Sequence, residues 1–531
     1  MTFAVLAVAL AALVPQDLVL EGVTVHTGTG AEFGPRIVVV QGRIAAPDAE
    51  PPTGAEVRKL PGFVVPGLHD AHAHLLGLGA ALEQVDLVGT KSYAEVIERV
   101  RARAARTPAG EWILGRGWDQ NDWDDTRFPE HGPLSAAVPD HPVWLVRIDG
   151  HAALANARAM AAAGLTSESE NPDGGEILRD ASGAPTGVLI DRAMALVGGS
   201  VPEPSAAVLE RRLLAAHHAC LAAGLTCVHD AGIGPHELEL VRALWRQGRW
   251  KLRLYAMLPA SAEDAIRAGP WQTPDDVLIV RAVKGYADGA LGSRGAALLA
   301  PYADRPGHRG LLVTPHAELA RQAQLCADHG FQFCVHAIGD AANRTVLDVF
   351  AATRLRDGLR AARFRIEHAQ VVAEADFARF AELGVLPSMQ PTHLTSDMPW
   401  APERLGEERV RGSYAWRRFL ALDLPVAFGS DFPVEGHDPR LGLFAAVTTR
   451  APGGAQEMRP EQKLSRAEAI AGFTRAAAYA AFLEHEVGTI EPGKRADFTV
   501  FDRDLTACAE DEILQADVLL TVIGGRVVYA R

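Results

Sequence analysis

Cysteine is scarce in this chain of 531 residues, and the few cysteines form no recognisable motif. The sequence contains five, an odd number, and none of them belongs to a Cys-x-x-Cys pair. Disulfide frameworks and thiolate zinc sites both require cysteines that recur at short, regular spacings. Neither is indicated here, and we expect the thiols to be free and buried.

Positive charge is also in short supply. Lys and Arg total 52 against 66 Asp and Glu, which gives a formal net charge of −14. Proteins bind the phosphate backbone of nucleic acids through clustered Lys and Arg, so nucleic acid is an unfavourable partner for this chain. Hydrophobic residues at 48% and charged residues at 22% are ordinary for a soluble globular enzyme. We therefore expect a small-molecule substrate, and the sequence leaves a homodimer open.

A run of apolar residues long enough to span a bilayer is absent. The apolar N-terminal segment, residues 1–14, is too short for that and has about the length of a signal-peptide core. It contains no Lys or Arg. We expect residues 1–16 to be a signal segment and favour an exported or periplasmic protein. The alternatives are a wrongly assigned start or an ordered first strand, in a cytoplasmic protein.

Short strand-like segments occur at both ends of the chain. Their apolar residues alternate with polar ones, and the last two are separated by a Gly-Gly turn. We expect the two ends of the chain to pair in one small sheet. The segments are residues 18–25, 36–40, 496–501, 518–523 and 526–529.

Between these ends, apolar runs alternate with helical stretches rich in Ala, Leu, Arg and Glu. This alternation is typical of parallel strands joined by crossover helices. Eight parallel strands close naturally into a barrel, so we expect an α/β fold with a TIM-like (β/α)8 barrel. The eight runs are residues 63–65, 225–228, 252–257, 278–283, 331–335, 364–366, 385–389 and 424–428.

Polar side chains follow most of these runs, where barrels of this kind carry their chemistry. The segment 66–74, Pro-Gly-Leu-His-Asp-Ala-His-Ala-His, follows the first run and presents His72 and His74 two residues apart. Residues i and i+2 of an extended segment point to the same side, so both imidazoles can bind one ion. The residues that follow the runs are His72, His74, His229, Asp230, Lys284, His336, His368 and Asp431.

The gap between the first and second runs, about residues 75–215, is too long for one crossover and predicts an insertion. Residues 115–123 and 149–153 combine aromatic residues, carboxylates and glycines in what we expect to be loops. One interpretation is a lid or pocket wall in which Trp118, Asp119 and His151 contact the substrate. The other, equally supported, is that these residues cap and turn an inserted subdomain.

Six of the polar groups form a mixed nitrogen and oxygen set suited to zinc or a similar divalent ion. Two neighbouring ions would use six ligands economically, although one ion is the safer expectation. A lysine ammonium would be repelled by two dications, so Lys284 fits only if carbon dioxide carbamylates it to an anionic bridge. The alternatives are that Lys284 forms an ion pair in a pocket, and that each histidine is a core residue whose ring is hydrogen-bonded within the protein.

The sequence resembles the amidohydrolase superfamily, specifically the branch called amidohydrolase family 3. The resemblance covers nearly the whole chain. It implies a barrel at residues 62–485 and a small β-sandwich built from residues 17–61 and 486–531. The matching motifs are residues 66–74, 283–294, 335–340, 365–368, 429–433 and 488–497.

The resemblance also implies metal-dependent hydrolysis of C–N bonds in amides, N-acyl or N-formyl compounds. The metal lowers the pKa of a bound water to give a hydroxide nucleophile, and Asp431 acts as general base and then general acid. The sequence departs from the family pattern at none of the ligand positions. By this resemblance the ligands are His72, His74, Lys284 as the carbamate, His336, His368 and Asp431.

Several assignments stay open at this point. Arg294 either holds a substrate carboxylate or forms a structural ion pair. Asp70 and Glu367 either support the metal ligands or make ordinary strand-end hydrogen bonds. The runner-up activities are hydrolysis of another electrophile, such as an ester, and a hydration or decarboxylation on the same metals. A barrel that has lost its chemistry and serves as a scaffold is the non-enzymatic alternative.

Overall fold

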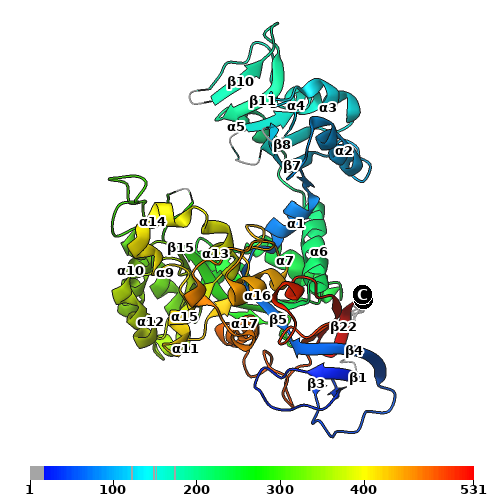
Figure 1. Ribbon diagram of the computed structural model, residues 1–531, viewed down its shortest axis with the longest axis vertical. Coiled ribbons are helices and arrows are strands. Elements are labelled where there is room, and N and C mark those ends of the chain that lie inside the picture. Colours follow the sequence, from blue (N-terminus) through cyan, green and yellow to red (C-terminus); the bar gives the residue numbers. More distant parts are fainter. Residues whose placement is uncertain (1–16, 121–122, 148–149, 151, 173–174, 293) are drawn as a thin grey trace, which may run out of the picture. The chain divides into compact units, whose positions relative to one another are not determined.

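The computed structural model describes residues 17–531 except 121–122, 148–149, 151, 173–174 and 293. The chain divides into two compact units, Met1–Leu78 with Leu213–Arg531 and Gly79–Arg212 (Figure 1). The expected signal segment, residues 1–16, and His151 both lie outside the described residues. Among the described residues, no helix is long and apolar enough to cross a membrane.

The larger unit contains the expected barrel, which confirms the fold class. Eight strands pair in parallel in chain order, and the short strand β14 (Trp271–Gln272) adds to β15 in the antiparallel sense. Just after the last strand, the Asp431 amide donates to the carbonyl of His72 in the first strand at 2.7 Å. The barrel strands are β5 (Leu68–Ala73), β12 (Leu225–Ala231), β13 (Arg253–Pro259), β15 (Leu278–Tyr286), β16 (Gln332–Ala337), β17 (Arg365–His368), β18 (Leu386–Met389) and β19 (Ala427–Phe428).

The first barrel strand is not the run at residues 63–65, and the prediction was wrong there. That run belongs to β4 (Glu56–Pro66), which pairs with strands from both chain ends. A short apolar run suits either sheet, so periodicity cannot assign it. The chain then passes Gly67, where a Cβ atom would lie 2.3 Å from the Thr226 hydroxyl, and enters β5. His72 therefore lies inside a barrel strand rather than after one.

Helices surround the barrel strands, and their buried faces follow the spacing of apolar residues (Figure 1). In α7, Pro235 occupies the first turn and Leu238, Val241 and Leu244 are buried at intervals of three residues. Burying each such side chain contributes about 1.5–3 kcal/mol. The helices outside the smaller unit are α7 (Pro235–Arg246), α8 (Glu263–Arg267), α9 (His316–His329), α10 (Asp340–Ala352), α11 (Leu359–Ala362), α12 (Phe377–Leu383), α13 (Pro391–Asp397), α14 (Ala401–Val410), α15 (Trp416–Leu420), α16 (Pro439–Thr448), α17 (Arg466–Gly472) and α18 (Arg475–Ala480). Helices α1 (Leu75–Glu83) and α6 (Ala206–Ala222) each contain one of the two boundaries between the units.

Both chain ends pair in one seven-stranded sheet, as expected. Strand β20 runs antiparallel to β4, with Phe498 opposite Pro66 and Phe501 opposite Phe63. Alternating apolar residues of these strands form a separate core that includes Leu20, Val39 and Val500. The order is β22 (Arg526–Ala530), β21 (Val518–Ile523), β20 (Phe498–Phe501), β4, β1 (Leu18–Val25), β2 (Arg36–Val40) and β3 (Arg43–Ile44).

The smaller unit, Gly79–Arg212, has its own six-stranded sheet and cores. Two expected loops are partly strands here, because residues 115–118 belong to β7 and residues 152–155 to β9. Gly115 allows close packing, since a Cβ atom there would lie 2.8 Å from the Leu145 side chain. The strands, in sheet order, are β10 (Gly175–Arg179), β11 (Pro185–Asp191), β9 (Ala152–Ala155), β8 (Val143–Arg147), β7 (Ile113–Trp118) and β6 (Val85–Asp86). The helices are α2 (Tyr93–Ala104), α3 (His131–Ala137), α4 (Ala157–Ala162) and α5 (Met194–Gly198).

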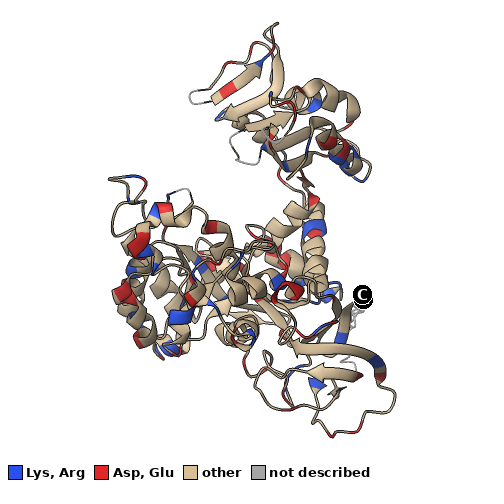
Figure 2. Cartoon of the chain, in the orientation of Figure 1, with Lys and Arg blue, Asp and Glu red and all other residues tan. Residues whose placement is uncertain are grey.

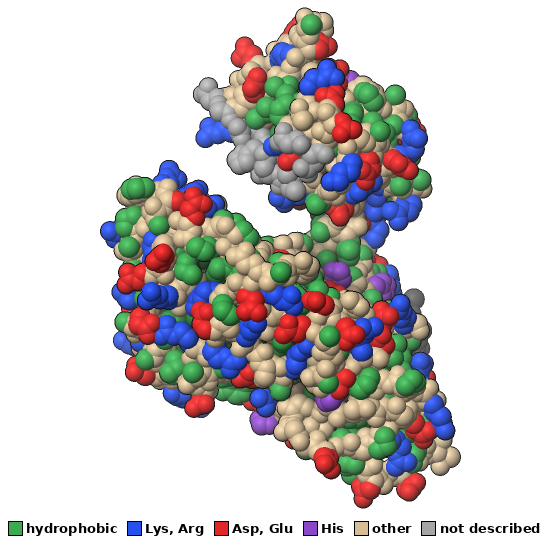
Figure 3. Space-filling view, in the orientation of Figure 1, with side chains coloured by type: hydrophobic (Ala, Val, Ile, Leu, Met, Phe, Trp, Pro, Cys, Tyr) green, Lys and Arg blue, Asp and Glu red, His purple; other side chains and the backbone are tan. Residues whose placement is uncertain are grey.

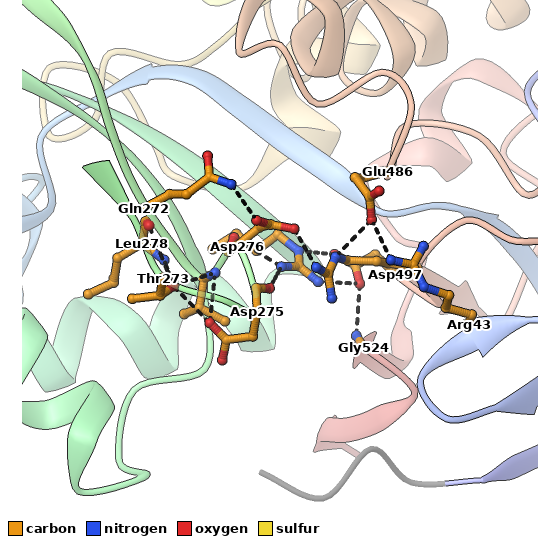
Figure 4. Close-up of polar contacts among 12 residues, drawn as sticks. Arg43, Gln272, Thr273, Asp275, Asp276, Leu278, Glu486, Asp497 and Gly524 are labelled. Atoms are coloured by element: carbon orange, nitrogen blue, oxygen red, sulfur yellow. Dashed lines mark hydrogen bonds and ion pairs between the residues drawn. The ribbon is translucent and has the colours of Figure 1, made fainter. Parts of the chain in front are cut away.

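Charged side chains of both signs are interspersed over the face in view rather than gathered by sign (Figures 2 and 3). A buried polar network joins the seven-stranded sheet to the barrel (Figure 4). Asp497 accepts two hydrogen bonds from Arg253 at 2.5 and 3.0 Å and one from the Gly524 amide at 2.8 Å. Arg253 also donates to the carbonyls of Asp275 and Asp276. Both partners of the ion pair are almost completely buried.

Replacing Asp497 with Ala should destabilise the protein by about 3–5 kcal/mol, because the Arg253 guanidinium would be left buried and unpaired. The urea midpoint of the purified protein measures this effect. Glu21→Ala is the matched control, because Glu21 forms an exposed ion pair with Lys59 in the same sheet. Such surface pairs contribute about 0–1 kcal/mol. Equal midpoints for the two variants would contradict the assigned role of Asp497.

Candidate metal centre

The carboxyl ends of the barrel strands bring all six expected ligands to one cavity of about 380 Å³. His72, Lys284, His336 and His368 lie within strands β5, β15, β16 and β17, while His74 and Asp431 follow β5 and β19. The strands therefore extend further than the apolar runs of the sequence predict. His368 and Asp431 have left-handed backbone, with φ of 74° and 63°. Such strain concentrates at functional sites.

Three of these residues lie close enough together to share one ion. His72, His368 and Asp431 each present a possible ligand atom, and these atoms lie within 4.8 Å of one another. The Asp431 Oδ1 atom lies 3.1 Å from His74 Nε2 and 3.6 Å from His72 Nε2. The Lys284 amine lies 3.1 Å from His72 Nε2. The geometry thus gathers nitrogen and oxygen donors around a small common volume.

His336 stands beside this group. Its ring centroid is 4.6 Å from that of His368. Its Nε2 atom is buried and has no hydrogen-bond partner among the described residues. Buried ring nitrogens are nearly always paired, so an unpaired one is what a metal-ligating atom is expected to show before its ion is bound. The donor chemistry of the site therefore fits a divalent ion.

Glu367 fixes the orientation of His72. Its carboxylate accepts from His72 Nδ1 at 2.5 Å, which leaves the Nε2 lone pair directed at the cavity. Arg365 donates to both Glu367 oxygens and to the Ala71 carbonyl. Burial alone would raise the pKa of Glu367, but the charge of Arg365 holds it well below its usual value. Glu367 thus supports a ligand rather than binding an ion itself.

Asp70 joins the first and last strands of the barrel. Its carboxylate accepts from the Ser430 amide at 3.0 Å, the Ser430 hydroxyl at 2.6 Å and the His72 amide at 3.1 Å. Burial raises the pKa of Asp70 to about 7, although these hydrogen bonds oppose the rise. Asp70 therefore positions the backbone of His72 and the segment that carries Asp431.

Burial holds the pKa of His72, His336 and His368 below its usual value, which favours the neutral rings that metal ligands require. Burial lowers the pKa of His72 to about 4 and that of His336 to about 3. Burial also lowers the pKa of Lys284, so the neutral amine is more accessible than in water. Burial would raise the pKa of Asp431, but the hydrogen bond from His74 holds it well below its usual value.

Gln390 supports His368 from the end of β18. The His368 Nδ1 atom lies 2.8 Å from Gln390 Oε1. An acceptor at this position holds the proton on Nδ1 and leaves Nε2 free. Gln390 is not among the residues expected from the sequence, although the seventh run ends at residue 389 and the strand-end rule could have found it.

Gln390→Leu should weaken metal affinity about 10- to 100-fold, because His368 loses the acceptor that orients it. Competition with a chromogenic chelator measures the affinity. Gln324→Leu, on the exposed face of α9, is the control and should bind metal like the parent protein. An unchanged affinity in Gln390→Leu would show that packing alone orients His368.

The expected substrate contacts are placed differently. Trp118 is buried in the core of the smaller unit, where its indole nitrogen donates to the Leu145 carbonyl at 2.9 Å. Asp119 forms an ion pair with Arg147 at 2.8 Å. Arg294 is in the larger unit but does not line the cavity, and both its Nε and Nη2 atoms bind Asp304. Trp118 therefore packs in a core and Arg294 forms an ion pair, as the structural alternatives for these two residues expect.

A second group of possible ligands lies inside the barrel, formed by His69, Cys227 and His229. Arg365 lies 3.1 Å from His229 Nδ1. Because arginine only donates, His229 Nδ1 accepts, and the proton of the neutral ring lies on Nε2. Burial raises the pKa of the Cys227 thiol. His229 therefore has no free lone pair for an ion, and Cys227 is held as the thiol, so of these three residues only His69 offers a free lone pair on a ring nitrogen.

Comparison with known proteins agrees with the fold and the site. The model of the amidohydrolase family matches residues 62–529. Protein LONG AFTER FAR-RED 3 of Arabidopsis thaliana is 35% identical over 490 residues, 88% of this chain and 82% of that protein. The N-substituted formamide deformylase of Arthrobacter pascens is 28% identical over 509 residues, 92% of this chain and 91% of that protein.

A solved structure shows the same fold. The crystal structure of an uncharacterized metal-dependent hydrolase from Pyrococcus furiosus superposes with a TM-score of 0.76 at 29% identity. The match covers 92% of this chain and 100% of that protein. The family match includes every barrel strand and all six residues at the cavity. The chain therefore belongs to the amidohydrolase family and is a metal-dependent hydrolase.

Proposed function

We propose that this protein hydrolyses a C–N bond in a small amide, an N-acyl compound or an N-formyl compound. The observation that carries the proposal is the convergence of four histidines, Lys284 and Asp431 on one cavity. The similarity to an N-substituted formamide deformylase over nearly its whole length supports the same class of substrate.

Zinc is the ion that this donor set suits best, because neutral imidazoles and a carboxylate are its common ligands. A bound ion would supply an activated water and polarise the substrate carbonyl. We assign His72, His74, Lys284, His336, His368 and Asp431 as the ligands of one or two ions. Lys284 would contribute as a carbamate, formed when its neutral amine attacks carbon dioxide and releases a proton.

Asp431 is the residue that moves the proton in this proposal. Its backbone amide is bonded to His72 and its carboxylate to His74, so its orientation is defined. The low pKa keeps the carboxylate ionised, and water on a bound ion would be acidic enough to give it a proton. The same residue then returns the proton to the departing nitrogen, which leaves as an amine. The other product is a carboxylic acid.

A hydrolysis screen with zinc-reconstituted protein tests the proposal. The panel contains N-acyl amino acids, N-substituted formamides, cyclic amides and dipeptides, with release of amine as the readout. We expect turnover of at least one amide class, and loss of both metal and turnover in His336→Ala while the barrel stays folded. Cleavage of esters with no amide cleaved, or full metal and activity in His336→Ala, would contradict it.

A further inference from the structure

The cavity at the metal centre carries two carboxylates beyond Asp431. Asp397 and Glu435 both line it. Among the described lining residues there is no arginine, and Lys284 is the single lysine. Lys284 is itself one of the proposed ligands. The part of the cavity wall formed by Asp397 and Glu435 is therefore negatively charged.

Both carboxylates are held by neutral donors. Asp397 accepts from the Tyr414 hydroxyl at 2.8 Å and from the Gln370 amide at 2.7 Å. Glu435 accepts from the Ser396 hydroxyl at 2.6 Å. No lysine or arginine in the described part of the chain is ion-paired with either carboxylate. A positively charged group of a ligand could therefore form an ion pair with these carboxylates.

The two carboxylates also act on each other. Burial raises the pKa of Asp397, and the negative charge of Glu435 adds to the rise, while His393 and Tyr414 oppose it. A cationic group between the two carboxylates would relieve this repulsion. A third carboxylate in the same place would add to it.

His393 independently points to a ligand in this cavity. Its side chain lines the cavity, the residue is 9% exposed, and its Nε2 atom is buried with no hydrogen-bond partner among the described residues. The ring stacks on His368 at 5.8 Å between centroids. The nearest carboxylate oxygen in the described part of the chain, Asp431 Oδ2, lies 3.7 Å from this nitrogen, too far for a hydrogen bond, so a polar group of a bound molecule is expected to meet it.

The rest of the wall is apolar and aromatic. Leu291, Ile338 and Trp400 line it, and a Cβ atom on Gly292 would lie 3.3 Å from the Trp400 ring. Arg404 lies 4.6 Å from the centre of that ring, but its guanidinium is ion-paired with Asp304 at 3.6 Å.

Asp304 is also the partner of Arg294. Both arginines of this region contact the Asp304 carboxylate, and neither of them lines the cavity.

We propose that the cavity selects amides whose departing amine carries an apolar or aromatic group with a cationic or neutral substituent, and disfavours those that carry a carboxylate. Asp397 and Glu435 are the specificity-determining residues, and Trp400 and Leu291 receive the apolar group. This inference rests on the proposed amide hydrolysis. It separates N-substituted amides of simple amines from N-acyl amino acids, whose carboxylate would meet two like charges.

Three formamides that differ at one position test the inference on turnover. They are N-benzylformamides with an aminomethyl, a methyl or a carboxylate group in the para position. We expect kcat/KM to fall in that order, with the carboxylate compound at least about tenfold below the methyl compound. Glu435→Lys should reverse the order of the charged pair, and Glu435→Gln should reduce the difference between them. Glu382→Gln, on the outer surface of α12, is the control and should keep the parent order.

A binding experiment distinguishes a failure of this inference from a failure of the proposed reaction. Two benzohydroxamates, one with a para aminomethyl group and one with a para carboxylate, share the same metal-binding group and differ only in distal charge. Calorimetry on the zinc-loaded protein should show the cationic compound bound at least about tenfold more tightly, with the order reversed in Glu435→Lys. If no formamide is cleaved but this binding order holds, the reaction is wrong and the selectivity stands. Equal binding and equal turnover of the charged pair would overturn the selectivity.

Discussion

Asp431→Asn is expected to lower kcat by about a hundred- to ten-thousand-fold, the usual contribution of a general acid–base group. This corresponds to about 2.7–5.4 kcal/mol in the activation barrier. The amide keeps the shape of the side chain and one oxygen, but its nitrogen cannot accept the proton of the attacking water. Substrate affinity should change far less than the rate. Steady-state kinetics with a metal analysis of the same preparation measures both effects.

Asp328→Asn is the matched control for this experiment. It makes the same change of carboxylate to amide at an exposed position of α9, outside the cavity. We expect its kcat to equal that of the parent. A rate for Asp431→Asn within about threefold of the parent would show that the proton is carried elsewhere.

Lys284→Ala is expected to lose bound metal and nearly all activity, which is the second large effect. As proposed, Lys284 would be an anionic carbamate between two dications, so its removal would leave their repulsion uncompensated. Formate, acetate or propionate should restore part of both losses by occupying the vacated space. Metal analysis and turnover at increasing carboxylate concentration measure the rescue.

Lys284→Arg is the matched control. It keeps a permanent positive charge that carbon dioxide cannot convert, so carboxylates should not rescue it. In the parent protein, 13C NMR in labelled bicarbonate should show one carbamate resonance that is missing in Lys284→Ala. A fully active Lys284→Ala enzyme, or an active parent with an unmodified amine, would contradict the bridge. The site would then be mononuclear, on a subset of the histidines with Asp431.

The sequence alone predicted the architecture well because its patterns are local. Strands 18–25 and 518–523 were expected from alternating residues and occur with those bounds. The barrel was expected from eight apolar runs, and seven of the runs overlap its strands. The residues at the strand ends could be expected to meet, because parallel strands present their carboxyl ends on one side of a barrel.

The tertiary structure decided what depends on partners distant in the chain. The run at residues 63–65 joins the sheet of the two chain ends, because strands from both ends offer it hydrogen bonds. The expected loop around Trp118 is partly a strand, because Leu145 packs where Gly115 leaves room. Local periodicity carries no information on which distant segment will pair with a short run.

The same distinction holds at the site. Histidines next to strand ends are visible in the sequence as ligand candidates, since residue type and local spacing define them. The charge environment of the cavity is not visible, because it depends on which cations are already paired. Arg294 is a plausible carboxylate partner in the sequence, and only the fold shows that Asp304 occupies it while Asp397 and Glu435 face the cavity. Residue identity and spacing thus predicted which donor side chains meet at one cavity, whereas long-range ion pairing determined the charge that surrounds them.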